Sequence, residues 1–220
     1  MKTAIEYIKE AWAIYTKKEN FIFFARIMAV LSIIAFTIGM VNGYFFPADY
    51  LKDGDFSNVP LFVGFILISI LSIVFGLWSQ STSYFAVIKM GEPEKEVFKI
   101  GFKKIGKYLL VTLVLGIIIF FGLILLVIPA IIFGIWYSFT LLLVLDKDIG
   151  IGEALKKSKE MVNGKFWKIL GRTAIFGLFS ILISIVVSIV PFVGEFAVSF
   201  LSPLFMLPFY LLYRDLSINS

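Results

Sequence analysis

Charged side chains that fall within long apolar runs are the residues of this chain most able to do chemistry inside a membrane. Arg26 interrupts an apolar run from residue 21 to 46, and Glu195 follows Pro191 inside the last run. An ionisable residue within a span is a functional candidate, because its burial without a partner is unfavourable. Other interpretations stay open: Arg26 can extend its charge to the membrane surface, and Glu195 can lie in a turn among headgroups or water.

A polar segment, Ser79-Gln80-Ser81-Thr82-Ser83, lies within the second apolar run. The amide of Gln80 needs hydrogen-bond partners in apolar surroundings, because a buried amide without them is destabilising. The sequence allows two roles for Gln80: a hydrogen bond to a neighbouring helix, or a contact with a bound ligand.

A group of basic residues is a candidate site for anionic lipid headgroups. The group comprises Lys156, Lys157, Lys159, Lys165, Lys168 and Arg172. Each basic residue beside an anionic leaflet adds about 1 kcal/mol of attraction. The same charges also orient a chain in the membrane, so a purely orienting role stays open.

Histidine and cysteine are both absent from the 220 residues. Their absence removes the usual general base at neutral pH, the thiolate nucleophile and most transition-metal ligand sets. The chain also has no glycine-rich phosphate loop and no serine nucleophile elbow. We therefore expect no enzyme, no cofactor and no metal site. The net charge of +5 does not predict nucleic-acid binding, because the basic residues lie in short segments between apolar runs.

The composition predicts a single all-α integral-membrane domain over residues 1–220. Hydrophobic residues make up 60% of the chain and charged residues 16%, which is more apolar surface than a soluble domain of this size can bury. Because a span needs roughly 20 apolar residues, the two longest runs are expected to turn back at Pro129 and Pro191. The predicted spans cover residues 21–46, 61–88, 108–127, 130–145, 166–190 and 194–213.

The distribution of charge predicts the orientation of these spans. With six spans, every lysine and arginine except Lys52 falls on one side of the membrane. Because cytoplasmic loops collect basic residues, both termini are expected in the cytoplasm, with the protein in the plasma membrane. The first residues lack the pattern of a cleaved signal peptide, so the first span is expected to be retained.

Three segments with amphipathic helical patterns precede three predicted hairpins of spans, at residues 3–18, 93–105 and 150–163. The expected apolar faces are Ile5, Ile8, Trp12 and Tyr15 in the first, Phe98, Phe102 and Ile105 in the second, and Ile151, Leu155 and Val162 in the third. Such faces are typical of helices that lie in the membrane interface. The three units share an outline, but their unequal spacing leaves a true repeat open.

Two predicted spans contain features that can interrupt a helix. The segment 130–145 is short for a bilayer, and the last span contains Pro203 and Pro208. Interrupted helices expose backbone groups and sometimes form binding sites. Kinked packing without a ligand explains the same residues.

A motif between residues 125 and 167 resembles one family of membrane proteins. It combines Pro129 in an apolar turn, the segment 153–158 with sequence Glu-Ala-Leu-Lys-Lys-Ser, and Gly164 before an aromatic residue. This pattern is similar to the integral-membrane domain attached to some glycerophosphodiester phosphodiesterases and its stand-alone relatives, including the YciC-like proteins. Ala130 stands where that family usually has glycine. The resemblance implies a six-span domain without catalysis of its own, and it provides no functional residues to carry over.

Together these observations favour a non-enzymatic membrane protein, either a scaffold or a lipid-associated bundle. Its expected partners are membrane lipids, including anionic headgroups on the cytoplasmic face, and a membrane or cytoplasmic protein. The alternative is a small-solute transporter or channel component, for which the interrupted helices and the polar face around Gln80 are the argument. An enzyme acting on lipids ranks third, because histidine is missing.

Overall fold

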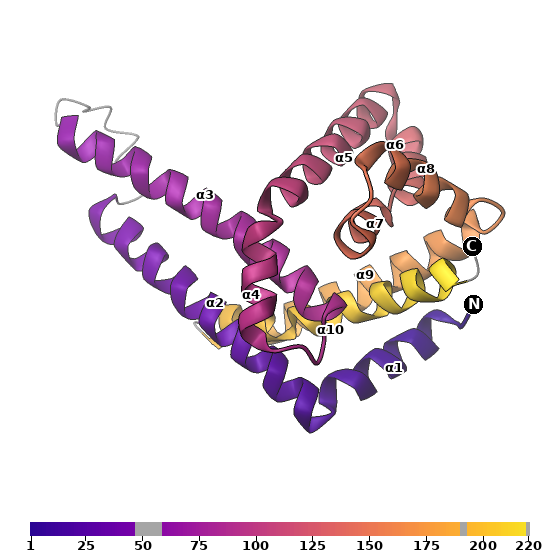
Figure 1. Ribbon diagram of the computed structural model, residues 1–220, viewed down its shortest axis with the longest axis horizontal. Coiled ribbons are helices and arrows are strands. Elements are labelled where there is room, and N and C mark those ends of the chain that lie inside the picture. Colours follow the sequence, from indigo (N-terminus) through magenta and orange to yellow (C-terminus); the bar gives the residue numbers. More distant parts are fainter. Residues whose placement is uncertain (47–58, 190–192, 219–220) are drawn as a thin grey trace.

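The computed structural model describes residues 1–46, 59–189 and 193–218, which form ten helices and no strand (Figure 1). The helices are α1 (Ala4–Thr16), α2 (Lys18–Phe45), α3 (Val59–Ile88), α4 (Glu94–Lys103), α5 (Ile105–Leu125), α6 (Val127–Trp136), α7 (Thr140–Lys147), α8 (Ile151–Val162), α9 (Phe166–Ser188) and α10 (Val193–Ile218). The all-α prediction is therefore confirmed for these residues.

Within the described ranges, six segments are long and apolar enough to cross a membrane. They are Lys18–Phe45, Val59–Ile88, Ile105–Leu125, Val127–Lys147, Phe166–Ser188 and Phe196–Ile218. The number agrees with the sequence prediction, and the fold has the architecture of a multi-pass membrane protein. The predicted turn at Pro191 and the loop with Lys52 lie outside the described residues.

The turn between α5 and α6 lies at Leu126, so the predicted break at Pro129 is wrong. Leu126 has a φ of 148°, which is rare for a residue with a side chain. Pro129 instead lies in the first turn of α6, where its missing N–H removes no helical hydrogen bond. A Cβ on Gly122 would lie 2.8 Å from the Cα of Ala130. Two small residues therefore allow α5 and α6 to pair closely.

The fourth span is interrupted between α6 and α7, at residues 137–139. Ser158 of α8 contacts this break from the side. Its hydroxyl donates to the Trp136 carbonyl at 2.8 Å and accepts from the Phe139 N–H at 3.1 Å. Because Ser158 is fully buried, it satisfies two backbone groups that the interrupted helix leaves without partners. The sequence predicts a short fourth span, 130–145; the structure instead has a 21-residue segment, Val127–Lys147, with an interruption inside it.

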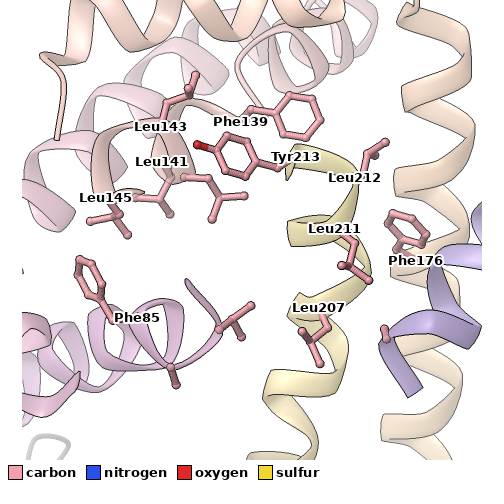
Figure 2. Packing of buried hydrophobic residues seen from close by; sticks show 14 of the residues in the cluster. Phe85, Phe139, Leu141, Leu143, Leu145, Phe176, Leu207, Leu211, Leu212 and Tyr213 are labelled. Carbon is pink, nitrogen blue, oxygen red and sulfur yellow. The ribbon is translucent and has the colours of Figure 1, made fainter. Parts of the chain in front are cut away.

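Helix α10 lies at the centre of the bundle and packs against α1, α2, α3 and α9. Figure 2 shows its leucine side chains facing α9, where Phe176 lies, and Tyr213 pointing toward Leu141 and Leu143 of α7. Pro203 and Pro208 lie inside α10. The hydroxyl of Tyr15 donates at 2.9 Å to the carbonyl of Phe200, one turn before Pro203, and so links α1 to this part of α10.

Burial is concentrated at the end of the molecule that carries the basic residues. The buried core comes from α1, the first half of α2, the end of α3, the region from Ile135 to Leu145, and the second half of α10. The opposite halves of α2, α3, α5 and α9 expose large apolar side chains along most of their length. Figure 1 shows the α2–α3 pair and the α5–α6 pair extending in different directions. Such exposed apolar surface suits contact with lipid.

The three short helices α1, α4 and α8 begin and end within two residues of the predicted amphipathic segments, but their buried faces differ from the prediction. Helix α1 buries Tyr7, Ala11 and Tyr15, while Ile5 and Trp12 are 62% and 53% exposed. The reason is that each short helix packs against a longer one: α1 against α10, α4 against α3 and α8 against α7.

The corresponding faces of α4 and α8 are likewise built around small residues. Helix α4 buries Val97 and Gly101, whereas Phe102 is 63% exposed. Helix α8 buries Ala154 and Ser158 together with Met161 and Val162. Small side chains allow two helices to cross closely, so the buried faces contain small residues. The sequence prediction relied on large apolar residues and therefore identified a neighbouring face of each helix.

Candidate functional site

Arg26, the charge within the first span, has a defined partner. Its Nη1 atom lies 3.1 Å from Oε1 of Glu94, the first residue of α4. The Arg26 side chain is largely exposed, so its charge is at the surface of the bundle. A hydrogen bond from the backbone N–H of Glu94 and the contact with Arg26 both lower the pKa of the Glu94 carboxyl. Arg26 therefore connects α2 to α4.

Gln80 is exposed on α3, and within the described part of the chain its amide makes no hydrogen bond. Its neighbours Ser81 and Thr82 are fully buried instead, with hydroxyls that have no partner among the described residues. Thr82 faces α4, since a Cβ on Gly101 would lie 2.9 Å from the Thr82 Cα. The polar segment thus contributes its small residues to the contact between α3 and α4, and Gln80 points away from it.

The lysines of α8 do not converge on one point. At about 100° per residue, Lys156 and Lys157 project in clearly different directions around the helix. Both are exposed. The Nζ atom of Lys159 lies 4.4 Å from the centroid of the Trp136 ring, a cation–π contact. Lys159 therefore supports the packing of α8 on α6.

Arg172 lies in a basic hollow of about 400 Å³ near the two ends of the chain. This basic hollow is lined by Met1, Lys165, Lys168, Arg172, Asp215 and Leu216. Lys168 and Arg172 lie on α9, Lys165 is the residue just before this helix, and Asp215 lies on α10. The structure therefore brings Arg172 together with Lys165 and Lys168, and it separates them from Lys156 and Lys157.

Hydrogen bonds fix the groups around the basic hollow. The Nε and Nη1 atoms of Arg172 donate to the carbonyls of Lys2 and Lys168, each at 2.8 Å. Asp215 accepts from the Tyr7 hydroxyl at 2.7 Å. Burial, and then this hydrogen bond, raise the pKa of the Tyr7 hydroxyl, so Tyr7 remains a neutral donor. The guanidinium of Arg172 is thereby held in one orientation beside the two lysines.

Two further cavities, of about 200 and 210 Å³, lie deeper along the spans. Both are lined by Tyr84, Leu142 and Phe209, so they form one groove between α3, the α5–α7 region and α10. We refer to this pair of cavities as the tyrosine groove. Its lining is mainly aliphatic and aromatic, with hydroxyls from Tyr84, Tyr137, Ser138 and Tyr210.

Glu195 lies in the first turn of α10, but its side chain is outside the described residues. Among the residues that the structure describes, no three histidine, cysteine, aspartate or glutamate side chains are grouped so that they could hold a metal ion. No protein-family model, curated protein or solved structure matches the chain. The function must therefore be argued from the geometry of the chain itself.

Several structurally important side chains were missed in the sequence analysis. Ser158 bridges the α6–α7 break, and Tyr213 donates to Asp146 at 2.8 Å, as Tyr7 does to Asp215. Ser158 carries a usable signal, because it is a small residue one turn after another small residue, Ala154. The two tyrosine–aspartate pairs carry none, since their members are distant in sequence.

Proposed function

We propose that this chain is a non-enzymatic multi-pass membrane protein that binds anionic phospholipid headgroups at its basic end. The basic hollow is the observation that carries this proposal, because it gathers Lys165, Lys168 and Arg172 around a single concave surface. Among the described residues of its lining, Asp215 is the only carboxylate, and it accepts a hydrogen bond from Tyr7. A phosphate group would therefore meet an excess of positive charge.

The chemistry of the hollow suits a phosphodiester headgroup. A guanidinium presents its N–H groups in a planar fork that matches phosphate oxygens, while lysines add mobile positive charge. The Nε and Nη1 groups of Arg172 bond to the two carbonyls, and its Nη2 group makes no hydrogen bond among the described residues. Lys165 and Lys168 would together add about 2 kcal/mol of attraction beside an anionic leaflet.

The proposal includes an orientation for the fold. The six spans form three hairpins, α1, α4 and α8 lie along the cytoplasmic interface of the plasma membrane, and both termini are cytoplasmic. The distribution of basic residues supports this arrangement. Trp12 and Trp167, exposed by 53% and 79% near the basic end, support it as well, since tryptophan favours the interface.

The resemblance to the membrane domain of glycerophosphodiester phosphodiesterases remains part of the proposal. Ser158 supports it by giving the Glu-Ala-Leu-Lys-Lys-Ser segment a structural reason: the serine stabilises the interrupted fourth span. The resemblance implies a membrane domain without catalysis of its own. In this proposal the chain therefore acts as a membrane scaffold, and any catalysis comes from a separate partner protein.

Lipid retention by charge variants tests the proposed headgroup site. The protein is reconstituted in nanodiscs of phosphatidylglycerol and phosphatidylcholine, released, and examined by native mass spectrometry for retained lipid. We expect the double variant Lys165→Gln/Lys168→Gln to lose most of its preference for phosphatidylglycerol. Lys156→Gln/Lys157→Gln removes the same charge from exposed positions of α8 and should keep that preference.

Other results of this experiment would contradict the proposal. An equal loss of the preference for phosphatidylglycerol in both double variants would mean that only the total charge matters. An unchanged preference in both would exclude the basic hollow as a lipid site. The transport alternative is examined with the same preparations in sealed vesicles. A flux of a small solute that is abolished by Gln80→Leu, with folding intact, would show that the protein is a transporter and not a scaffold.

A further inference from the structure

The tyrosine groove lies beside the last turns of α3 and the middle of α5. Tyr84 is one turn from the end of α3 at Ile88, about 6 Å at 1.5 Å per residue. On α5, the lining reaches Ile119, about 21 Å from the start of the helix at Ile105. In the proposed orientation, and with a hydrocarbon core about 30 Å thick, these positions fall mainly in the leaflet at the basic end.

Polar groups of the groove gather around its middle and its basic end. The hydroxyls of Tyr84, Tyr137 and Tyr210 make no hydrogen bond within the described ranges. At the α6–α7 break, the N–H of Ser138 bonds to the Ile135 carbonyl, so the Gly134 carbonyl lacks its usual helical donor. These groups offer hydrogen bonds that suit ester and glycerol oxygens, which lie just below the headgroups of a bilayer.

The remainder of the lining is apolar and held in place. Phe209 stacks on Phe139 with ring centroids 5.1 Å apart, and the ring of Tyr84 lies 6.0 Å from that of Tyr108 at the start of α5. A Cβ on Gly134 would meet nothing within 4 Å, which leaves open space beside this residue. The aromatic residues that line the groove are therefore packed against neighbouring rings, and the space beside Gly134 is open.

From this geometry we infer that the tyrosine groove is a binding site for one acyl chain of a phospholipid from the leaflet at the basic end. The apolar lining matches the chain, the lining positions fall mainly in one leaflet, and the tyrosine hydroxyls lie where the ester groups would be. The inference is independent of the basic hollow, because it depends on the acyl chain and not on the charge of the headgroup.

Photocrosslinking tests the inference directly. The probe is a phosphatidylcholine with a diazirine halfway along one acyl chain, incorporated into nanodiscs with the full-length protein, and the labelled residues are mapped by mass spectrometry. We expect labels on groove residues such as Leu115, Leu142 and Met206. Labels spread evenly over the exposed apolar halves of α2, α3, α5 and α9 would overturn the inference. This test uses the unmodified protein alone.

A matched pair of glycine variants sharpens the test. Gly134→Leu should fill the groove and reduce its labelling several-fold. Gly116→Leu adds the same side chain to α5, where a Cβ also meets nothing within 4 Å and no groove residue is altered, so it should leave labelling unchanged. Equal labelling in both variants would contradict an acyl-chain site.

The headgroup distinguishes this site from the proposed function. A phosphatidylglycerol probe with the same diazirine chain should label the groove as strongly as the phosphatidylcholine probe. Lys165→Gln/Lys168→Gln should also leave this labelling unchanged. Groove labelling by the anionic probe alone would show that headgroup charge drives binding, and the acyl-chain site would then be rejected.

Discussion

Ser158 shows how one hydroxyl can join two helices in this protein. It is fully buried and bonds to both sides of the α6–α7 break. Lys157 and Lys159, its neighbours in sequence, point elsewhere, and Lys159 covers Trp136. The small uncharged residue between two lysines therefore bonds to both sides of the break in the fourth span, and neither lysine does.

Ser158→Ala should destabilise the fold. The substitution leaves the Trp136 carbonyl and the Phe139 N–H buried without this partner, and each unsatisfied group costs about 1–3 kcal/mol. We expect a clearly lower midpoint of thermal unfolding in detergent. Ser180→Ala is the control, because its hydroxyl bonds only to the Phe176 carbonyl of its own helix. Similar midpoints for the two variants would show that Ser158 is not required at the break.

Asp148 predicts a specific response to acid. It ends α7 with a φ of 57°, and its carboxylate contacts Lys104 at 2.5 Å and also Lys107. Hydrogen bonds from these lysines lower the pKa of Asp148 from 3.8 to about 2. Because the pKa of the folded state is depressed, the stabilisation is present above pH 4 and is lost as the pH falls toward 2.

Asp148→Asn is the variant that isolates this charge, because asparagine also tolerates a positive φ. The variant should lose less stability than the unmodified protein between pH 4 and pH 2, as measured by thermal unfolding at each pH. Parallel pH profiles for the two proteins would show that the lysine contacts do not contribute to folding.

At the scale of helices, close approach depends on a few small residues. Gly122 and Ala130 pair α5 with α6, and Gly101 lies against Thr82 where α4 crosses α3. A stripe of small residues can be recognised in the sequence, but it does not reveal which neighbour each residue will meet. For this reason Gly122 had no assigned role in the sequence analysis, while the structure makes it the point where two spans touch.

Gly122→Ala and Gly116→Ala should have opposite effects on stability. Alanine at position 116 meets nothing within 4 Å and should stabilise α5 by about 0.5–1 kcal/mol, since glycine is a poor helix former. At position 122 the added methyl would lie 2.8 Å from the Ala130 Cα, so the helices must separate, at roughly 1–3 kcal/mol. Unfolding midpoints that shift in the same direction would contradict this account of the α5–α6 turn.

The sequence predicts the helices of this fold far better than their contacts. Length and apolarity identify all six span candidates, and apolar residues at helical spacing identify the positions of α1, α4 and α8, because these signals are local. The turn at Leu126 was misplaced because Pro129 fits the first turn of a helix as well as it ends one. Of the predicted basic group, Lys165, Lys168 and Arg172 lie in the basic hollow, whereas the lysines of α8 do not, since convergence of side chains depends on the tertiary fold.

At the scale of the whole molecule, the basic end is packed and the opposite end is open. The buried core gathers near the cationic helices, and the far halves of the spans expose their apolar side chains. Each short helix contacts the final helix of a pair: α4 on α3, α8 on α7, and α1 on α10. The last of these contacts joins the first and last helices and closes the arrangement.

The proposed orientation can be tested with single cysteines, because the natural chain contains none. Lys157→Cys should react with an impermeant maleimide only after the cell membrane is opened, since α8 is placed in the cytoplasm. Asp53→Cys, in the segment predicted to connect the first two spans and outside the described residues, should react in intact cells. Labelling of both cysteines from the same side would exclude the three spans, an odd number, that the fold places between them.

The contact between α1 and α10 has a consequence for the synthesis of the protein. Tyr7 and its partner Asp215 are 208 residues apart, so the first helix leaves the ribosome long before the helix that covers it. Until then, the face with Ala11 and Tyr15 must stay on the membrane surface without its final partner. Completion of the bundle therefore waits for insertion of the last span, and a nascent chain arrested before α10 would present an uncovered α1 to the machinery that recognises incomplete membrane proteins.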